Sequence, residues 1–91
     1  MEKKPVKTFG ISFGEGTRGC IDYYGDSVVI SGAKNISIQK NYVTGLNKLE
    51  EKPLSKFLVE LEYYDFAGIK NSSQFNINSN DFLVLKNLLQ V

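Results

Sequence analysis

Two carboxylates, Glu60 and Glu62, are the side chains in this sequence best spaced for acid–base chemistry. They alternate with apolar residues, which predicts a strand that carries both on one face, about 6.6 Å apart. Paired acid and base carboxylates use separations of this size. A solvated outer strand face gives the same pattern, and the chain contains no histidine. We therefore favour the outer face and expect that the protein is not an enzyme.

Cys20 is the single cysteine of the chain. A Cys–His nucleophile is excluded, because no histidine is present to act as its base. A zinc site needs several clustered Cys and His ligands. We therefore expect no catalytic residue, no metal site and no cofactor.

Residues 14–19 spell a G-x-G-x-x-G string, the pattern of loops that bind nucleotide phosphates. In nucleotide-binding domains a helix follows the string, and its N-terminal N–H groups hold the phosphate. Here a strand is expected instead, because Ile21 and Tyr23 alternate with Cys20, Asp22 and Tyr24. A hairpin loop is the favoured interpretation.

Two tyrosines, Tyr24 and Tyr64, fall on the polar faces of their expected strands. Aromatic rings in such positions can stack on nucleic-acid bases or anchor a protein interface. Cross-strand packing is the simpler account of both rings. We keep them as candidate binding residues because tyrosine is enriched at interfaces.

Basic side chains supply the other binding candidates, which are Lys7, Arg18, Lys48, Lys52 and Lys56. The last three follow one another at four-residue spacing and, with Lys3, Lys4 and Lys7, could form a weak basic patch. Glu50 and Glu51 largely offset the charge of these three lysines, which favours a solvated loop.

Most of the chain alternates with period two and is punctuated by Gly and Asn, which predicts short antiparallel strands joined by turns. Strands are expected over residues 8–13, 20–24, 27–30, 36–43, 57–64 and 74–78, with turns at 14–19, 25–26 and 65–70. Gly45 should stop or bend the fourth of these. We interpret residues 45–56 as the longest loop, with room for one helical turn. The core face of the clearest strand carries Phe57, Val59, Leu61 and Tyr63.

The apolar period changes from strand-like to helical at Ser79. Ser79 or Asn80 is expected to cap the helix, and Asp81 suits the positive end of its dipole. The stripe expected to pack on the sheet contains Phe82, Leu85, Leu88 and Leu89, with Val84 beside it. The sequence therefore predicts a mainly β fold with one C-terminal helix.

The composition fits one small folded domain. The 91 residues are 42% apolar and 23% charged, far from the signature of disorder. We expect a single domain over residues 1–91, with residues 1–6 as a flexible N-terminal tail. The net charge of +1 offers no general attraction to nucleic acid or anionic lipid. The single cysteine suits a reducing cytoplasm, and we expect neither a signal peptide nor a transmembrane segment.

About seven short strands followed by one helix resemble the bacterial pleckstrin-homology-like and GRAM-like domains. The segments that carry this resemblance are residues 22–30, 35–43 and 58–64, then Gly68, Phe75 and Ile77, and finally residues 81–85. Together they cover roughly residues 20–90. The resemblance implies a bent β sandwich or partly open barrel with the helix closing one end, in a domain that binds other molecules and is seldom an enzyme. Lipid-binding members carry basic residues from the first strand to the second, where this chain has Lys7 and Arg18 but also Gly19 and Cys20.

The leading hypothesis is thus a non-catalytic interaction module of pleckstrin-homology-like type. Its expected partner is another protein or a second copy of the chain, since edge strands in so small a sheet must be covered or paired. The second hypothesis is binding to anionic lipid surfaces through Lys7, Arg18 and the lysines of residues 45–56. The third is single-stranded nucleic acid binding by a small barrel through Tyr24 and Tyr64, against which the near-neutral charge argues.

Overall fold

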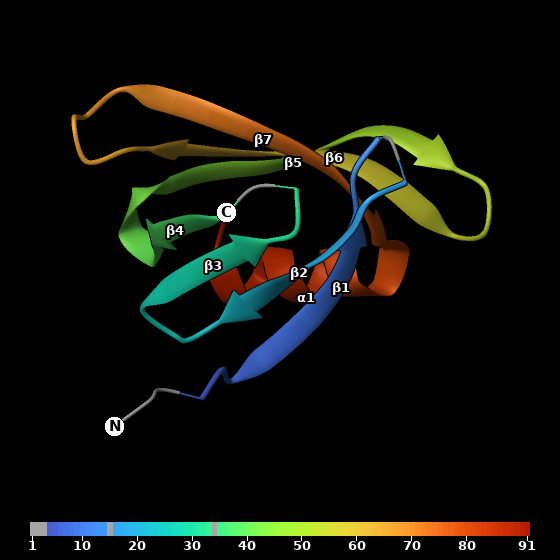
Figure 1. The fold of residues 1–91 in the computed structure, drawn as a ribbon, viewed down its shortest axis with the longest axis horizontal. Coiled ribbons are helices and arrows are strands. Elements are labelled where there is room, and N and C mark those ends of the chain that lie inside the picture. Colours follow the sequence, from blue (N-terminus) through green and yellow to red (C-terminus); the bar gives the residue numbers. More distant parts are fainter. Residues whose placement is uncertain (1–3, 15, 34) are drawn as a thin grey trace.

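The computed structural model describes residues 4–14, 16–33 and 35–91, which form a mostly antiparallel β fold with one C-terminal helix (Figure 1). The elements are β1 (Lys7–Ser12), β2 (Arg18–Tyr23), β3 (Ser27–Ser31), β4 (Ile36–Gln39), a 3₁₀ turn η1 (Lys40–Tyr42), β5 (Val43–Lys52), β6 (Lys56–Tyr64), β7 (Lys70–Asn78) and α1 (Ser79–Leu89). The predicted fold class, with about seven strands and a C-terminal helix, is confirmed.

All strands belong to one sheet in the order β4-β3-β2-β1-β7-β6-β5. The middle of this sheet is its weakest seam, because β1 and β7 pair only through Ile11 with Ile77 and Ser12 with Asn76. The sheet bends at this seam, so that β1–β4 and β5–β7 form two layers of an open sandwich (Figure 1). β4 and β5 are left as its two edges.

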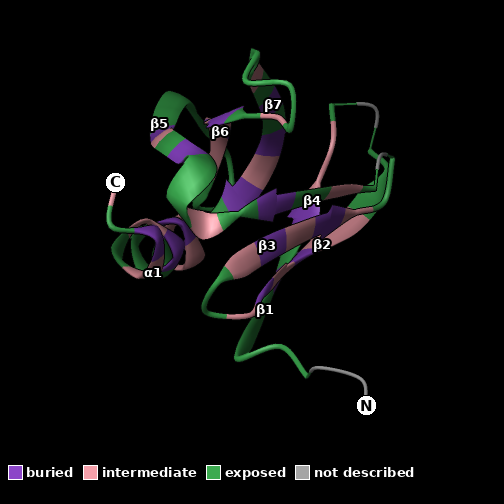
Figure 2. Cartoon of the chain, turned by 90° about the vertical axis from the view of Figure 1, so that its left-hand side faces the viewer, coloured by how far each residue is buried: buried purple, intermediate pink, exposed green. Residues whose placement is uncertain are grey.

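Alternate side chains of the strands fill the space between the layers, and α1 covers one end of it (Figure 2). Val59, Leu61 and Tyr63 are buried as predicted, and Phe57 is half-buried. On the helix Phe82, Leu85 and Leu89 are buried. The remaining core residues are Phe9, Ile11, Ile21, Tyr23, Val28, Ile30, Ile38, Val43, Leu46, Phe75 and Ile77.

The helix is fixed to the sheet by polar contacts as well as by its apolar stripe. Tyr23 donates its hydroxyl proton to the Leu88 carbonyl at 3.3 Å, and Lys86 donates to the Leu46 carbonyl at 3.0 Å. The prediction of Ser79 or Asn80 as N-cap is wrong. Asn78 is the cap, and its side-chain oxygen accepts the Asn80 N–H at 2.9 Å. The cap lies one residue earlier because Asn78 is still extended when its side chain reaches the first turn.

The interpretation of residues 45–56 as a loop is also wrong, because β5 runs to Lys52 and only residues 53–55 turn. Few apolar side chains mark this strand, since Val43 and Leu46 alone among its residues are buried. It forms through backbone pairing with β6. Two register shifts, at Val43/Gly45 and Lys48/Glu50, interrupt the regular alternation of inward- and outward-facing side chains along the strand. Gly45 lies at the first of these shifts and does not end the strand.

Other boundaries differ from the prediction at strand ends. The strand from Ile36 ends at Gln39, and η1 separates it from β5. β2 begins at Arg18, inside the predicted turn at 14–19, and β7 begins at Lys70, before the first apolar residue of the predicted strand. In the expected tail, Val6 donates its N–H to the Tyr23 carbonyl at 2.7 Å, while residues 1–3 lie outside the described part of the chain.

α1 is too short to span a membrane, and no other helix of the described residues is long and apolar enough to do so.

Candidate ligand-binding groove

β4 is an edge strand, and some of its backbone groups point away from β3, the strand it pairs with. Lys40 donates its N–H to the Asp26 carbonyl, so even-numbered residues here direct their backbone groups toward β3. By the alternation of an antiparallel ladder, Ser37 and Gln39 direct theirs away from β3. Both side chains are exposed. β4 therefore offers two rungs on which an added strand could pair.

An aromatic pocket of about 190 Å³ lies beside this edge. Its wall includes Tyr42 from η1, Tyr64 at the end of β6 and Phe66 in the β6–β7 turn, all exposed, and Phe66 is 85% exposed. Ser37 and Gln39 of β4 form part of the same wall. Exposed aromatic rings around a free strand edge are the features by which domains anchor an extended peptide.

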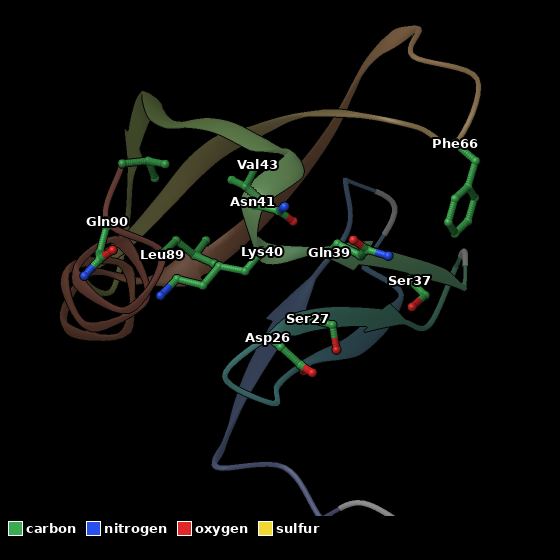
Figure 3. Close-up of a pocket in the computed structure, with 11 residues that line it drawn as sticks. Asp26, Ser27, Ser37, Gln39, Lys40, Asn41, Val43, Phe66, Leu89 and Gln90 are labelled. Carbon is green, nitrogen blue, oxygen red and sulfur yellow. The ribbon is translucent and has the colours of Figure 1, made fainter.

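A second, wider hollow of about 870 Å³ continues along β4 toward the end of α1. Ser37, Gln39 and Phe66 line both hollows, which therefore form one groove along β4. Figure 3 shows Phe66 hanging from the β6–β7 turn on one side, and Gln90 at the end of α1 on the other. We call the combined feature the β4 groove.

Asp65 organises the turn that carries Phe66. One carboxylate oxygen, Oδ1, accepts the N–H groups of Ala67 and Ile69 at 2.9 and 3.0 Å, and Oδ2 accepts the Asn71 amide at 2.9 Å. Backbone N–H donation from Ile69 is the main cause that holds the pKa of Asp65 below its usual 3.8, assisted by Ala67 and Asn71 and opposed by desolvation. The charged carboxylate thus holds the wall of the groove in place.

This arrangement predicts a loss of order in the turn at acidic pH. Because the folded pKa lies below the unfolded one, the carboxylate stabilises the turn fully above pH 3.8, and this contribution disappears as the pH falls through the folded value. The amide protons of Ala67 and Ile69 should lose hydrogen-exchange protection below about pH 4. NMR exchange measurements test this, with Asp65→Asn as a variant that should lack the transition. The same pH dependence of protection in the native protein and in Asp65→Asn would contradict the prediction.

The opposite edge of the sheet, β5, is protected against strand pairing in ways that β4 is not. β5 carries both register shifts and four charged side chains, and Lys48 and Lys52 form ion pairs with Glu51 and Glu50 at 3.0 and 3.8 Å. Charges and bulges of this kind discourage added strands. β4 has neither, since its sequence is Ile-Ser-Ile-Gln in regular pairing with β3.

Of the predicted aromatic binding residues, Tyr64 lines the groove and Tyr24 does not. Tyr24 is half-buried beside the β2–β3 turn, where its N–H donates to the Ser27 carbonyl at 2.9 Å. The two rings line no common pocket among the described residues. A base-stacking role for the two rings stays a prediction.

The predicted basic residues are spread over several strands of the sheet. Lys7 and Arg18 lie at opposite ends of the β1–β2 ladder, roughly 17 Å apart at 3.4 Å per residue. Lys48 lies 4.8 Å from the centre of the Phe57 ring, and Lys52 pairs with Glu50. Arg18 and Lys56, which are far apart in sequence, do line one pocket away from the groove.

The residues considered for catalysis have structural contacts. Glu60 accepts a hydrogen bond from Gln74 at 3.4 Å, and Glu62 lies 3.6 Å from Lys70. Cys20 is half-buried, with its Sγ 3.2 Å from the Ser31 hydroxyl. Of the glycine string, Glu15 lies outside the described residues, and the rest forms the β1–β2 turn and the start of β2.

Sequence reasoning missed Ser37, Gln39, Tyr42 and Phe66 as groove residues. Phe66 carried a usable signal, because an aromatic residue in the middle of a polar turn has no strand face to pack on. Ser37 and Gln39 carried none, since their importance lies in backbone groups at an edge that only the strand order defines.

No three His, Cys, Asp or Glu side chains of the described residues gather into a group that could hold a metal ion. No protein-family model matches the sequence, and no curated protein matches it either. Among the described residues, the β4 groove and the pocket at Arg18 and Lys56 are hollows lined by side chains from several elements.

Proposed function

We propose that this domain is a non-catalytic interaction module that binds an extended segment of a partner protein as an added strand on β4. The observation that carries the proposal is the contrast between the two sheet edges. β5 is protected by charges and bulges, whereas β4 is neutral, regular and bordered by exposed aromatic rings. An edge left unprotected beside a groove is the arrangement used for peptide recognition by strand addition.

The pairing would use the outward backbone groups of Ser37 and Gln39. Each residue has one N–H and one C=O available, so an added strand gains up to four backbone hydrogen bonds. Alternate side chains of that strand would point toward the pocket formed by Tyr42 and Tyr64. The expected ligand is therefore a short segment that alternates apolar and small polar residues.

A partner protein's extended segment fits the groove better than a second copy of this domain. Phe66 of the β6–β7 turn and Gln90 at the end of α1 both line the hollow beside β4. β4 of a second copy would bring the same flanking walls, which would obstruct a close approach of the two edges. A single extended chain meets no such obstruction.

Other features support an interaction role. The strand order followed by a closing helix suits the pleckstrin-homology-like pattern, whose members mostly bind other molecules. The carboxylates Glu60 and Glu62 are engaged by Gln74 and Lys70 and face no pocket among the described residues. The lone cysteine agrees with action in a reducing cytoplasm.

Substituting Gln39 with proline tests the proposal at the backbone. Gln39 has φ −71°, which proline adopts without strain, and its N–H points away from β3. Peptides selected on the native domain from a random peptide library displayed on phage should bind Gln39→Pro about tenfold more weakly, because one pairing donor is gone. Gln39→Ala keeps this N–H and should retain the native affinity. Isothermal titration calorimetry measures both.

Side-chain variants complete the test. Tyr64→Ala should weaken the same peptides about tenfold or more, whereas Tyr24→Ala removes an equal ring outside the groove and should leave their affinity unchanged. Circular dichroism should show native strand content for Gln39→Pro.

The proposal is wrong if the library yields no binding peptide, or if Gln39→Pro and Tyr64→Ala leave affinity unchanged. A native dimer in light scattering that Gln39→Pro dissociates would instead assign the edge to a second copy.

A further inference from the structure

A separate pocket of about 250 Å³ opens on the outer face of the sheet, where β1 and β7 part after only two paired rungs. Its side chains come from four strands. Ser12 lies opposite Arg18 on one neighbouring strand and opposite Asn76 on the other, so these three form a row across β2, β1 and β7. Lys56 lies opposite Asn78 and completes the lining from β6.

The pocket is cationic. Arg18 and Lys56 are the charged side chains that line it, and no acidic side chain of the described residues does so. Neither cation forms an ion pair with the described part of the chain. A third cation, Lys52, lies directly opposite Lys56 in the β5–β6 ladder, but it pairs with Glu50 at 3.8 Å and does not line the pocket.

The polar groups of the pocket fit an oxyanion. Ser12, Asn76 and Asn78 can donate hydrogen bonds beside the two cations. The side-chain oxygen of Asn76 is buried and accepts no hydrogen bond from the described residues, which is costly unless a donor arrives. Ser12 and the two side-chain amides thus add hydrogen-bond donors to the two positive charges.

Gly10 keeps the middle of the pocket open. A Cβ atom at this position would meet no atom of the described residues within 4 Å. Gly10 lies opposite Cys20 on regular β1–β2 pairing, so a side chain there would project from the outer face into the free space. A larger residue would fill the site without disturbing the core.

We infer that this pocket binds a phosphate monoester, with Arg18 and Lys56 holding the phosphoryl oxygens and the amides of Asn76 and Asn78 beside them. Arginine and lysine together are the usual protein groups for a phosphate oxyanion. The inference is independent of the β4 groove, which shares no residue with this pocket. The same chemistry is offered by a soluble phosphate ester and by a phosphomonoester lipid headgroup.

Two probes separate these sources. Glycerol 3-phosphate, titrated into the full chain and followed by NMR, should shift the Gly10, Ser12 and Asn76 resonances. Flotation with phosphatidylcholine vesicles, with and without phosphatidic acid, tests the lipid headgroup. The double variant Arg18→Gln/Lys56→Gln should weaken binding of the active probe at least tenfold, since each charge-assisted hydrogen bond contributes about a tenfold factor.

Matched variants distinguish the pocket from general charge attraction. Lys4→Gln/Lys7→Gln removes the same charge from exposed residues outside the pocket and should leave binding within twofold. Gly10→Val fills the pocket without changing charge and should abolish binding. If the pocket variants lose binding to glycerol 3-phosphate, the site takes a soluble phosphate ester. If they lose binding to vesicles that contain phosphatidic acid, the site takes a lipid headgroup. Binding of neither probe, binding insensitive to the pocket variants, or equal weakening by both charge variants overturns the inference.

Discussion

Leu85→Ala should destabilise the domain by about 3–5 kcal/mol, a large part of the stability available to so small a protein. Leu85 is 0% exposed at the centre of the helix face that packs on the sheet. Truncation leaves a cavity between α1 and the strands β6 and β7 that the rigid sheet cannot collapse to fill. Urea denaturation followed by circular dichroism measures the change in free energy of unfolding.

Leu83 provides the matched control on the same helix. Its side chain is 57% exposed, so Leu83→Ala changes helix propensity by the same amount but removes little packing. Its effect should stay within about 0.5 kcal/mol. Equal losses for the two variants would mean that α1 does not pack on the sheet through Leu85, and the described core would then be wrong.

Gly19→Ala should also destabilise the domain, by about 3 kcal/mol. A Cβ atom at Gly19 would overlap the carbonyl oxygen of Ser31 and approach the Phe13 ring to 2.9 Å and the Gly32 Cα to 3.3 Å. Two of these neighbours are backbone atoms, which cannot rotate away as a side chain does. Relief therefore requires β2 to separate from the end of β3, at the cost of their ladder.

Alanine at Gly10 should instead increase the stability of the domain. Gly10 and Gly19 occupy neighbouring rungs of the β1–β2 ladder, but only Gly10 has open space where a Cβ would lie. Gly10→Ala should stabilise the domain by about 0.5 kcal/mol, because alanine restricts the unfolded chain. Thermal unfolding of both variants measures the two changes in stability, a decrease for Gly19→Ala and an increase for Gly10→Ala. A stable Gly19→Ala protein would contradict the described packing of β2 against β3.

The contrast between the two glycines also explains the G-x-G-x-x-G string. Its last member, Gly19, is required for close approach of two strands and does not lie at a helix N-terminus. In nucleotide-binding domains the last glycine of the string lets a helix pack closely against a strand, whereas here it lets β2 pack closely against the end of β3. Motif spacing alone could not separate these two uses of glycine.

The sequence determined the elements whose alternation is strong. The face of β6 with Val59 and Leu61 and the amphipathic helix follow from side-chain periodicity, and the β2–β3 hairpin follows from the Gly25-Asp26 turn, which are local properties. β5 escaped prediction because it has few apolar residues and is held by its partner β6. Its strand character is a tertiary effect, since backbone pairing overrides a weak local preference.

The candidate sites depended still more on the tertiary structure. Tyr64, Arg18 and Lys56 were identifiable by residue type, but their grouping was not. Strand order leaves β4 as a free edge beside the Phe66 turn, and the short β1–β7 seam brings Arg18 of β2 near Lys56 of β6. Local patterns specify which way a side chain points along its strand. Only the packing of strands distant in sequence decides which side chains meet across a groove.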